Sequence, residues 1–191
     1  MNNEPLATTN LWQGKLVRLT ARNVETDAAL EARWERDSEF HRLGSPRPAY
    51  PVTLSQAKRW FEDRGPDSFR FSIRTLSDDR FLGDIGLWIG SWASGEAWVG
   101  IGIGEREYWG RGFGTEAMKL GVRYAFMELG AQRISLGLHE YNPRALKAYE
   151  KAGFRLEGRT RGDTLREGKH TDGLWMGILR DEWLAMQKAD E

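Results

Sequence analysis

The stretch WVGIGIGEREYWGRGFGTEAMKLGVRYAFMELG, residues 98–130, decides the fold of this chain. It opens with three glycines on alternate positions, Gly100, Gly102 and Gly104. Because strand side chains alternate between faces, this pattern predicts a strand with one bulky face and one bare face. Glycine inside a strand often marks a place where a ligand or another backbone comes close.

A second glycine cluster follows this strand and leads into a helix. Gly110, Gly112 and Gly114 surround Arg111, and apolar rows at helical spacing run through residues 113–129. The free backbone N–H groups and the positive end of the helix dipole at such a turn attract a phosphate. The combination is suited to a long ligand with a phosphate at one end. A bulged strand followed by a flexible entry loop is the other interpretation.

Length and composition limit the possible classes of protein. The chain has 191 residues, and we expect a flexible tail at 1–10 and a single domain at 11–191. Lys plus Arg and Asp plus Glu number 28 each, which gives no support to a nucleic-acid or membrane-surface binder. No apolar run approaches the ~18 residues that span a bilayer, and no signal pattern opens the chain. The absence of cysteine excludes disulfides, a cysteine nucleophile and thiolate metal sites, and it is consistent with a cytoplasmic protein.

The remaining elements follow from apolar periodicity and from capping and turn residues. Strands are expected at residues 15–20, 69–75, 81–89, 134–138, 154–158 and 173–179, and helices at 23–36, 53–65, 142–153 and 181–188. The segments 37–51 and 162–171 are expected to be irregular connections. The strand–helix–strand unit at 98–138 predicts a parallel strand pair, so the fold class is α/β with a mixed sheet (α+β).

Two polar residues mark the helix that begins near residue 142. Asn142 precedes a proline, which is a strong helix start, and Tyr149 follows two helical turns later on the same face. Both side chains are positioned to meet a ligand on the bare strand. For each residue taken alone, a purely capping role for Asn142 and a packing role for Tyr149 are the favoured interpretations.

These motifs resemble a known superfamily. The segment YWGRGFGTEA at 108–117, followed at this distance by NPRALKAYEKAGF at 142–154, closely resembles the GNAT superfamily of N-acetyltransferases. More narrowly, it looks like the branch of ribosomal-protein alanine N-acetyltransferases and polyamine acetyltransferases. The resemblance covers nearly the whole chain and implies a single-domain fold, with helices flanking a central mixed sheet that contains a splayed strand pair. It also implies acetyl-CoA as cosubstrate, a primary amine as acceptor, and no metal.

The resemblance implies a role for each matching position. Ile101, Gly102 and Ile103 would offer backbone groups to the pantetheine and the thioester carbonyl. The residues that would hold the pyrophosphate on helix N-terminal amides are Gly110, Arg111, Gly112, Phe113, Gly114 and Thr115. Asn142 would contact the cofactor arm, and Tyr149 would protonate the departing CoA thiolate as general acid.

One position departs from the family pattern. The phosphate motif usually begins with Gln or Arg, where this chain has Trp109. The backbone-amide cradle is unaffected by this change, but a side-chain contribution is lost. Arg111 is the candidate replacement.

The chemistry requires a neutral amine and two positioned substrates rather than a nucleophilic residue. An α-amine titrates near ~8 and needs little help from a base, whereas a lysine-type amine near ~10.4 needs more. Glu105 and Glu140 are the predicted catalytic carboxylates. Further candidates for the base are Glu107, the cluster of Glu35, Asp37 and Glu39, and the histidines His41 and His139. The predicted acceptor-binding residues are Glu35, Phe40, His41 and Trp88.

Other classes of protein fit less well. The glycine spacing matches neither nucleotide-binding fingerprint, and three scattered histidines do not make a metal site. A catalytically inactive CoA-binding sensor or interaction module is the remaining alternative. The acceptor is open between a protein N-terminus, a polyamine and another small-molecule amine, as are the use of other acyl groups and a homodimeric state.

Overall fold

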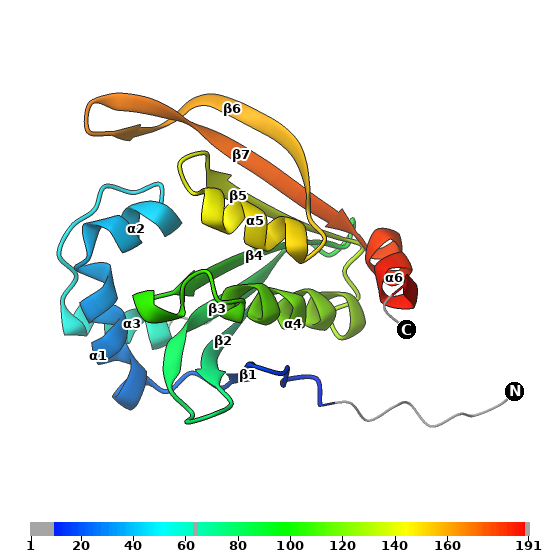
Figure 1. Cartoon of the computed structure of the whole chain (residues 1–191), viewed down its shortest axis with the longest axis horizontal. Coiled ribbons are helices and arrows are strands. Elements are labelled where there is room, and N and C mark those ends of the chain that lie inside the picture. Colours follow the sequence, from blue (N-terminus) through cyan, green and yellow to red (C-terminus); the bar gives the residue numbers. More distant parts are fainter. Residues whose placement is uncertain (1–9, 63–64, 190–191) are drawn as a thin grey trace, which may run out of the picture.

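Seven strands in the order β1-β2-β3-β4-β5-β7-β6 form one mixed sheet in the computed structural model, which describes residues 10–62 and 65–189 (Figure 1). The strands are β1 (Val17–Thr20), β2 (Ser68–Thr75), β3 (Phe81–Ser91), β4 (Glu96–Ile103), β5 (Arg133–His139), β6 (Arg155–Arg166) and β7 (Lys169–Leu179). The helices are α1 (Val24–Glu35), α2 (Ser38–Gly44), α3 (Leu54–Glu62), α4 (Phe113–Met127), α5 (Pro143–Lys151) and α6 (Arg180–Ala189), with a single 3-10 turn at Arg106–Tyr108.

The sheet has one parallel contact, between β4 and β5, and it is short. The paired positions are Glu96 with Arg133, Ala97 with Ile134, and Trp98 with Ser135. Beyond these pairs the two strands separate, while all other neighbouring strands pair antiparallel along most of their length. The predicted mixed sheet and its parallel strand pair are confirmed, and the separation leaves unpaired backbone at the C-terminal ends of β4 and β5.

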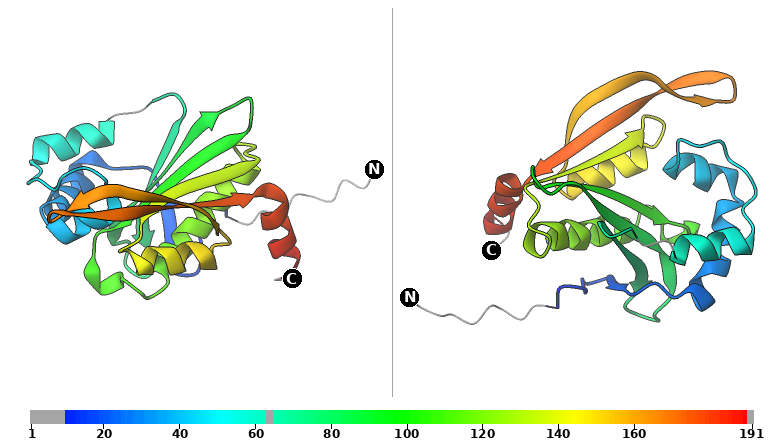
Figure 2. Two further views of the ribbon diagram at one scale, coloured as in Figure 1. Left: turned by 90° about the horizontal axis from the view of Figure 1, so that it is seen from above. Right: turned by 180° about the vertical axis from the view of Figure 1, so that it is seen from behind.

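The helices lie in two groups around the sheet. Figure 1 shows α4 and α5 on the near face and α1, α2 and α3 gathered at the left-hand end, and the views in Figure 2 agree. Gly121 of α4 lies directly over Ile85 and Leu87 of β3, where an added Cβ would approach Ile85 Cδ1 to 2.5 Å. The apolar core therefore lies between α4 and the sheet, and its largest fully buried members include Phe126, Ile73, Leu82, Met118, Ile134 and Ile178.

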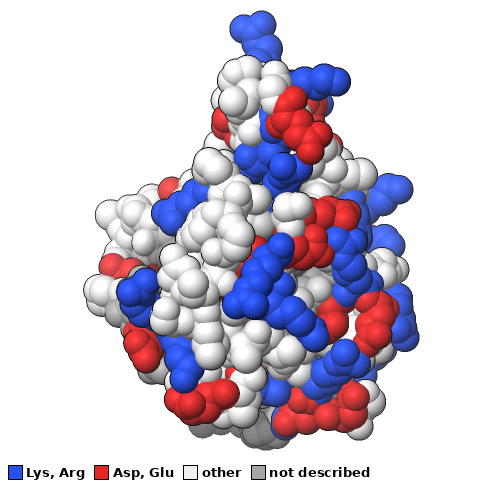
Figure 3. Space-filling view, turned by 90° about the vertical axis from the view of Figure 1, so that its left-hand side faces the viewer, with Lys and Arg blue, Asp and Glu red and all other residues white. Residues whose placement is uncertain are grey.

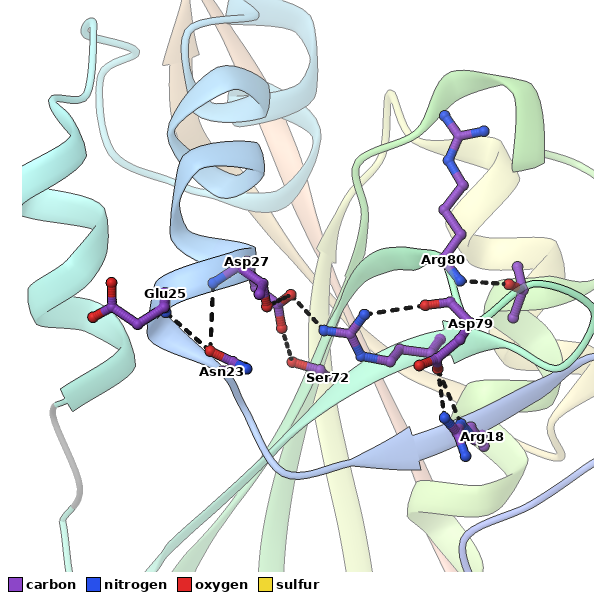
Figure 4. A network of polar contacts seen from close by, with 10 residues as sticks. Arg18, Asn23, Glu25, Asp27, Ser72, Asp79 and Arg80 are labelled. Carbon is purple, nitrogen blue, oxygen red and sulfur yellow. Dashed lines mark hydrogen bonds and ion pairs between the residues drawn. The ribbon is translucent and has the colours of Figure 1, made fainter.

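A buried carboxylate joins α1 to the sheet (Figure 4). Asp27, 1% exposed, accepts a hydrogen bond from Ser72 Oγ at 3.0 Å and pairs with Arg74 at 2.5 Å. Asn23 caps the helix by accepting from the N–H of Glu25 at 3.0 Å, as its position in the sequence predicts. These contacts hold α1 in position beside the separated ends of β4 and β5.

Two segments expected to be irregular are regular. Within 37–51 the chain forms α2, whose N-cap Asp37 accepts from the N–H of Glu39 at 3.0 Å. Within 162–171 it forms the far half of the β6–β7 hairpin, which turns at Glu167 and Gly168, both with positive φ. The prediction missed this hairpin because both of its faces are largely exposed there, so its polar residues show no apolar alternation.

The predicted tail at 1–10 lies outside the described residues except for Asn10, whose side chain accepts from the Trp12 N–H at 3.0 Å. Among the described residues, no helix has both the length and the apolar character needed to cross a bilayer. Within residues 10–62 and 65–189, no group of three or more His, Cys, Asp or Glu is placed to hold a metal ion.

Candidate active site

A cavity of about 1090 Å³ opens where β4 and β5 separate. Its walls come from β4, from the turn before α4, from one side of α5, and from α1 and α2. Figure 3 views the end of the molecule where α1 and α2 lie, and positive and negative side chains are interspersed over this surface. The charge pattern that matters for a ligand is therefore inside the cavity rather than around it.

The glycine face of β4 is covered by aromatic rings rather than left bare. The glycines Gly100, Gly102 and Gly104 lie respectively under Trp88, Phe40 and Trp34. A Cβ on Gly104 would lie 1.9 Å from Cδ2 of Trp34, so this glycine is required for packing. Gly102 and Gly100 leave ordinary contacts of 3.5 and 3.7 Å to their rings and still line the cavity. The expectation of a bare face thus fails at Gly104 and is modified at the other two.

The turn before α4 presents free backbone donors. Gly110 and Gly112 adopt φ values of +71° and +93°, which only glycine takes without strain, and Gly112 is an N-cap without a side-chain hydrogen bond. Among the described residues, no group accepts from the amides of the first helical turn at 113–115, because the helix ladder begins at Glu116. This turn therefore presents backbone donors of the kind that bind an anion, and anion binding stays a prediction.

Trp109, the residue that departs from the family pattern, makes contacts that the sequence does not predict. Trp109 donates from its indole nitrogen to the Ile103 carbonyl at 2.6 Å, and the guanidinium of Arg144 lies 3.6 Å over its ring. Arg144 lines the cavity, and burial lowers its pKa from the ordinary value. Arg111, the candidate replacement, instead donates to the Glu107 carbonyl at 3.1 Å and is not in the cavity wall. The cation nearest this position is therefore Arg144, which the sequence interpretation overlooked.

Most of the other residues assigned to the phosphate turn line the cavity, but one does not. Gly110, Gly112, Gly114 and Thr115 line the cavity, together with Lys119 and Lys147. Phe113 does not, because its ring packs perpendicular to that of Tyr108 at 4.9 Å between centroids. Ile101, Gly102 and Ile103 all line the cavity, although the carbonyl of Ile103 is already bonded to Trp109.

Tyr149 of α5 is in the cavity wall and is almost fully buried, at 9% exposed. Within the described residues its hydroxyl has no hydrogen-bond partner, and its ring lies 6.2 Å from that of Phe154. Burial raises its pKa to about 12. The phenol is therefore protonated at any physiological pH and can donate to a ligand atom beside it.

Asn142 makes two hydrogen bonds with its side chain. Its Oδ1 accepts from the N–H of Ala145 at 3.1 Å, which caps α5, and its Nδ2 donates to the carbonyl of Leu43 at 3.1 Å, in α2. The predicted helix cap is confirmed. Asn142 also lines the cavity, although both ends of its side chain are engaged by protein groups.

The two predicted catalytic carboxylates are not brought to the cavity. Glu105 is bound by Arg33 and lies 3.6 Å from Arg80, and Glu140 pairs with Arg159 at 2.9 Å. The surface carboxylates among the further base candidates are also paired with arginines, namely Glu107 with Arg80, and Asp37 and Glu39 with Arg106. These carboxylates therefore have no direct access to a ligand in this cavity.

The acceptor residues predicted from α1, α2 and β3 do line the cavity, and they are Glu35, Phe40, His41 and Trp88. Two further carboxyl groups join them that the sequence interpretation missed, Glu31 and Asp84. Burial, and then the nearby Asp84 carboxyl, raise the pKa of Glu31 well above its ordinary value, and burial also raises the pKa of Asp84. The available signal was helical spacing, because Glu31 lies one turn before Glu35 on α1.

Comparison with known proteins gives one family. Residues 18–155 match the family model described as an acetyltransferase (GNAT) domain. The SPbeta prophage-derived uncharacterized N-acetyltransferase YokL of Bacillus subtilis (strain 168) is 28% identical over 135 residues, which are 70% of this chain and 75% of that protein. Spermidine N(1)-acetyltransferase of Escherichia coli (strain K12) is 32% identical over 82 residues, 43% of this chain and 44% of that protein.

The fold is also similar to that of a solved structure. Spermidine N-acetyltransferase from Vibrio cholerae, solved in complex with CoA and spermine, superposes with a TM-score of 0.78 at 20% identity, over 88% of this chain and 98% of that one. The cavity beside a separated strand pair and the turn with free backbone donors are thus consistent with the family match. This chain belongs to the GNAT acetyltransferase family and is an acyl-CoA-dependent N-acetyltransferase.

Proposed function

We propose that this enzyme transfers the acetyl group of acetyl-CoA to a primary amine of a small molecule by direct attack, with Tyr149 as general acid. The observation that carries the proposal is the position of Tyr149, which reaches the cavity between the separated ends of β4 and β5 from the helix capped by Asn142. No nucleophilic side chain is needed in such a transfer, because the amine itself attacks the thioester.

One end of the cavity is suited to the pyrophosphate of acetyl-CoA, and the other end is suited to its pantetheine arm. The pyrophosphate lies on the free amides at 113–115, with Lys119, Lys147 and Arg144 supplying positive charge from the cavity wall. The pantetheine follows the unpaired edge of β4, where the strand offers backbone groups that no neighbouring strand uses. Acetyl-CoA supplies the acetyl thioester.

The transfer then needs little from the protein beyond position and one proton. The amine nitrogen bonds to the acetyl carbon, the carbon–sulfur bond breaks, and the phenol of Tyr149 gives its proton to the leaving thiolate. The new amide nitrogen loses a proton that restores the phenol. Because burial raises the pKa of Tyr149 to about 12, the acid is always in its protonated form when the thiolate leaves.

The acceptor is a cationic amine in its resting form. Glu31, Glu35 and Asp84 line the same side of the cavity, and carboxyl groups there attract an ammonium group. The Escherichia coli relative is named for spermidine, and the Vibrio cholerae neighbour holds spermine. These names support a small polyamine as the first acceptor to test, ahead of a protein N-terminus.

The test is release of the free CoA thiol from acetyl-CoA in the presence of a panel of amines. The panel contains spermidine, spermine, free lysine, peptides beginning with alanine or serine, and aminoglycosides. The absence of cysteine means that the protein adds no background to a thiol reagent. Turnover with a polyamine or another small amine supports the proposal, and turnover with the peptides alone replaces the small-molecule acceptor by a protein N-terminus.

Silence across the panel contradicts the transfer reaction. Thermal stabilisation by acetyl-CoA then separates the remaining cases, because a ligand that binds only the folded state raises the unfolding temperature. Stabilisation without turnover favours an inactive CoA-binding module. If acetyl-CoA gives neither stabilisation nor turnover, the proposal that it binds in this cavity is wrong.

A further inference from the structure

The wall of the cavity formed by α1 and α2 holds a contact between Glu35 and His41. Nδ1 of His41 contacts Oε2 of Glu35, and the side chains are only 6% and 15% exposed for His41 and Glu35 respectively. A carboxylate on Nδ1 holds the proton on that nitrogen and fixes the direction of the ring. Nε2 is then the nitrogen that carries the free lone pair.

That second nitrogen is unused by the protein. Among the described residues, no group forms a hydrogen bond with Nε2 of His41, although the atom is buried. Buried polar atoms are almost always hydrogen-bonded, so an exception calls for a physical reason. His41 is part of the cavity wall, so a ligand that reaches Nε2 from the cavity would supply the missing partner.

The neighbours of His41 place it on the acceptor side of the site. Phe40, the preceding residue, lies over Gly102, beyond the point where β4 leaves β5. Glu31 and Asp84 face the same space from α1 and β3, with Arg22, 3.8 Å from Asp84, and Arg70 of β2 as the nearby positive charges. The ring of Tyr50, from the segment after α2, lies edge-on to the imidazole at 6.1 Å.

The other histidine of the cavity lacks this arrangement. His139 stacks on Tyr141, with 4.9 Å between ring centroids, hydrogen-bonds to Thr164 at 3.5 Å, and lies beside the backbone of Ser45. Burial lowers its pKa below the ordinary value. Its ring is therefore engaged by the protein on both sides, which leaves His41 as the imidazole with a nitrogen to spare.

We propose that His41 is the general base of the acetyl transfer and that Glu35 is its positioning residue. The proposal rests on the proposed function and names the base that this function leaves open. The acceptor enters as an ammonium ion and gives one proton to Nε2, so that the neutral amine can attack the acetyl carbon. The imidazolium, stabilised by the Glu35 carboxylate, later releases that proton to solvent, and Tyr149 protonates the thiolate as before.

The test compares His41→Gln, Glu35→Gln and the wild-type enzyme in kcat/KM against pH, using whichever panel amine the wild type turns over. We expect His41→Gln to lose roughly 10²-fold or more in turnover near neutral pH, the low end of the effect of general base catalysis. The loss shrinks as the pH rises and the free amine becomes abundant in solution. His170→Gln is the matched control, because the His170 ring lies exposed on the hairpin, outside the cavity wall, with its Nδ1 3.1 Å from the Gly162 carbonyl oxygen.

Glu35→Gln separates positioning from structure. Its amide can still accept from Nδ1 but carries no charge, so the imidazolium loses the group that stabilises it. We expect the acid limb of the profile to move to lower pH, an effect that a purely structural change would not produce. Thermal stabilisation by acetyl-CoA confirms in each variant that the fold and the cosubstrate site are intact.

The outcomes distinguish a failure of the proposed base from a failure of the proposed transferase function. A wild-type enzyme that acetylates an amine, together with a folded His41→Gln variant of unchanged turnover and unchanged acid limb, overturns the role of His41 and leaves the transferase. An acid limb that disappears in His139→Gln instead assigns the base to that residue. If the wild-type enzyme turns over no amine, both the proposed function and the proposed role of His41 as base are wrong.

Discussion

Asn142 Nδ2 donates a hydrogen bond to the carbonyl of Leu43 at 3.1 Å, across the cavity from α5 to α2. The same side chain caps α5 through Ala145. One residue thus sets the start of the helix that carries Tyr149 and also holds the helix that carries His41. The proposed acid and the proposed base are connected through it.

Asn142→Ala and Asn142→Asp separate these two contacts. The alanine loses the cap and the bond to Leu43, and we expect a loss of about 1–2 kcal/mol in the free energy of unfolding. The aspartate keeps the cap but faces the Leu43 carbonyl without a donor, so α2 is released while α5 stays capped. We therefore expect Asn142→Asp to raise the KM for the amine with a smaller loss of stability than the alanine, as measured by steady-state kinetics and denaturant unfolding. Equal stability loss in both variants would contradict this division.

Removal of the Tyr149 hydroxyl tests the acid directly. In Tyr149→Phe we expect turnover to fall by roughly 10²–10⁴-fold, because the thiolate loses its proton donor, while the affinity for acetyl-CoA is kept. Tyr124→Phe is the control, because Tyr124 lies on α4 outside the cavity. Thiol release and acetyl-CoA titration measure the two quantities. A Tyr149→Phe variant with wild-type turnover excludes the phenol from the mechanism.

The tip of the β6–β7 hairpin also holds α2. Arg166 donates from Nη2 to the Ser45 carbonyl at 2.5 Å and from Nε to the Tyr141 hydroxyl at 3.1 Å, and that hydroxyl donates to the Arg42 carbonyl at 2.7 Å. The carbonyls at the C-terminal end of α2 are thus bound by cationic and phenolic donors, which is favourable at this end of a helix.

Arg166→Ala should therefore loosen the acceptor side of the site. We expect a several-fold increase in the KM for the amine and no change in acetyl-CoA affinity, because the phosphate turn is on the other side of the cavity. Arg161→Ala, on the same strand and exposed, is the control in the same steady-state assay. An increase of similar size in the control would attribute the effect to net charge rather than to the contact with α2.

The buried carboxyl of Glu31 makes stability depend on pH. Burial and the Asp84 carboxyl raise its pKa in the folded state, so the folded chain holds this proton at pH values where the unfolded chain has lost it. The contribution of Glu31 to stability therefore falls as pH rises from about 4 through its folded pKa. We expect Glu31→Gln to unfold a few degrees higher than wild type at pH 8 and to converge with it near pH 4, as followed by thermal melts.

Glu150→Gln provides the comparison, because Glu150 is exposed on α5. It should shift the melting temperature little at either pH. A Glu31→Gln variant that is less stable than wild type at pH 8 would show that the ionised carboxylate is net favourable in its site.

Gly104, which follows β4, is required for packing. Its substitution tests how tightly the aromatic side chain covers this position. A Cβ at this position would lie 1.9 Å from the indole of Trp34, and we expect Gly104→Ala to cost about 1–3 kcal/mol, as overpacking in a core does. Gly44→Ala, where nothing lies within 4 Å of the added atom, should be close to neutral. Denaturant unfolding of the two variants measures the difference, and similar free energies of unfolding would show that Trp34 moves aside at little cost.

The parts of the fold that the sequence predicts are those with strong local signals. The glycine turn at 110–114, the amphipathic helix after it and the Asn-Pro start at 142 each specify their own backbone. The short helix α2 has only seven residues and is too short to be stable alone, so it depends on contacts from Asn142 and Arg166 that lie far away in the sequence. The site divides in the same way. Backbone donors were predictable from glycine spacing. The choice between Glu105 and Glu35 was not, because it depends on tertiary contacts: Arg33 binds Glu105, whereas Glu35 contacts His41 in the cavity wall.

The central claim is that the thioester of acetyl-CoA lies between β4 and β5 beside Tyr149. A crystal structure with CoA bound tests it most directly. The account predicts the pyrophosphate on the amides of residues 113–115 and the sulfur within hydrogen-bond distance of the Tyr149 hydroxyl. CoA bound elsewhere, or in this cavity with its sulfur away from Tyr149, would contradict the claim.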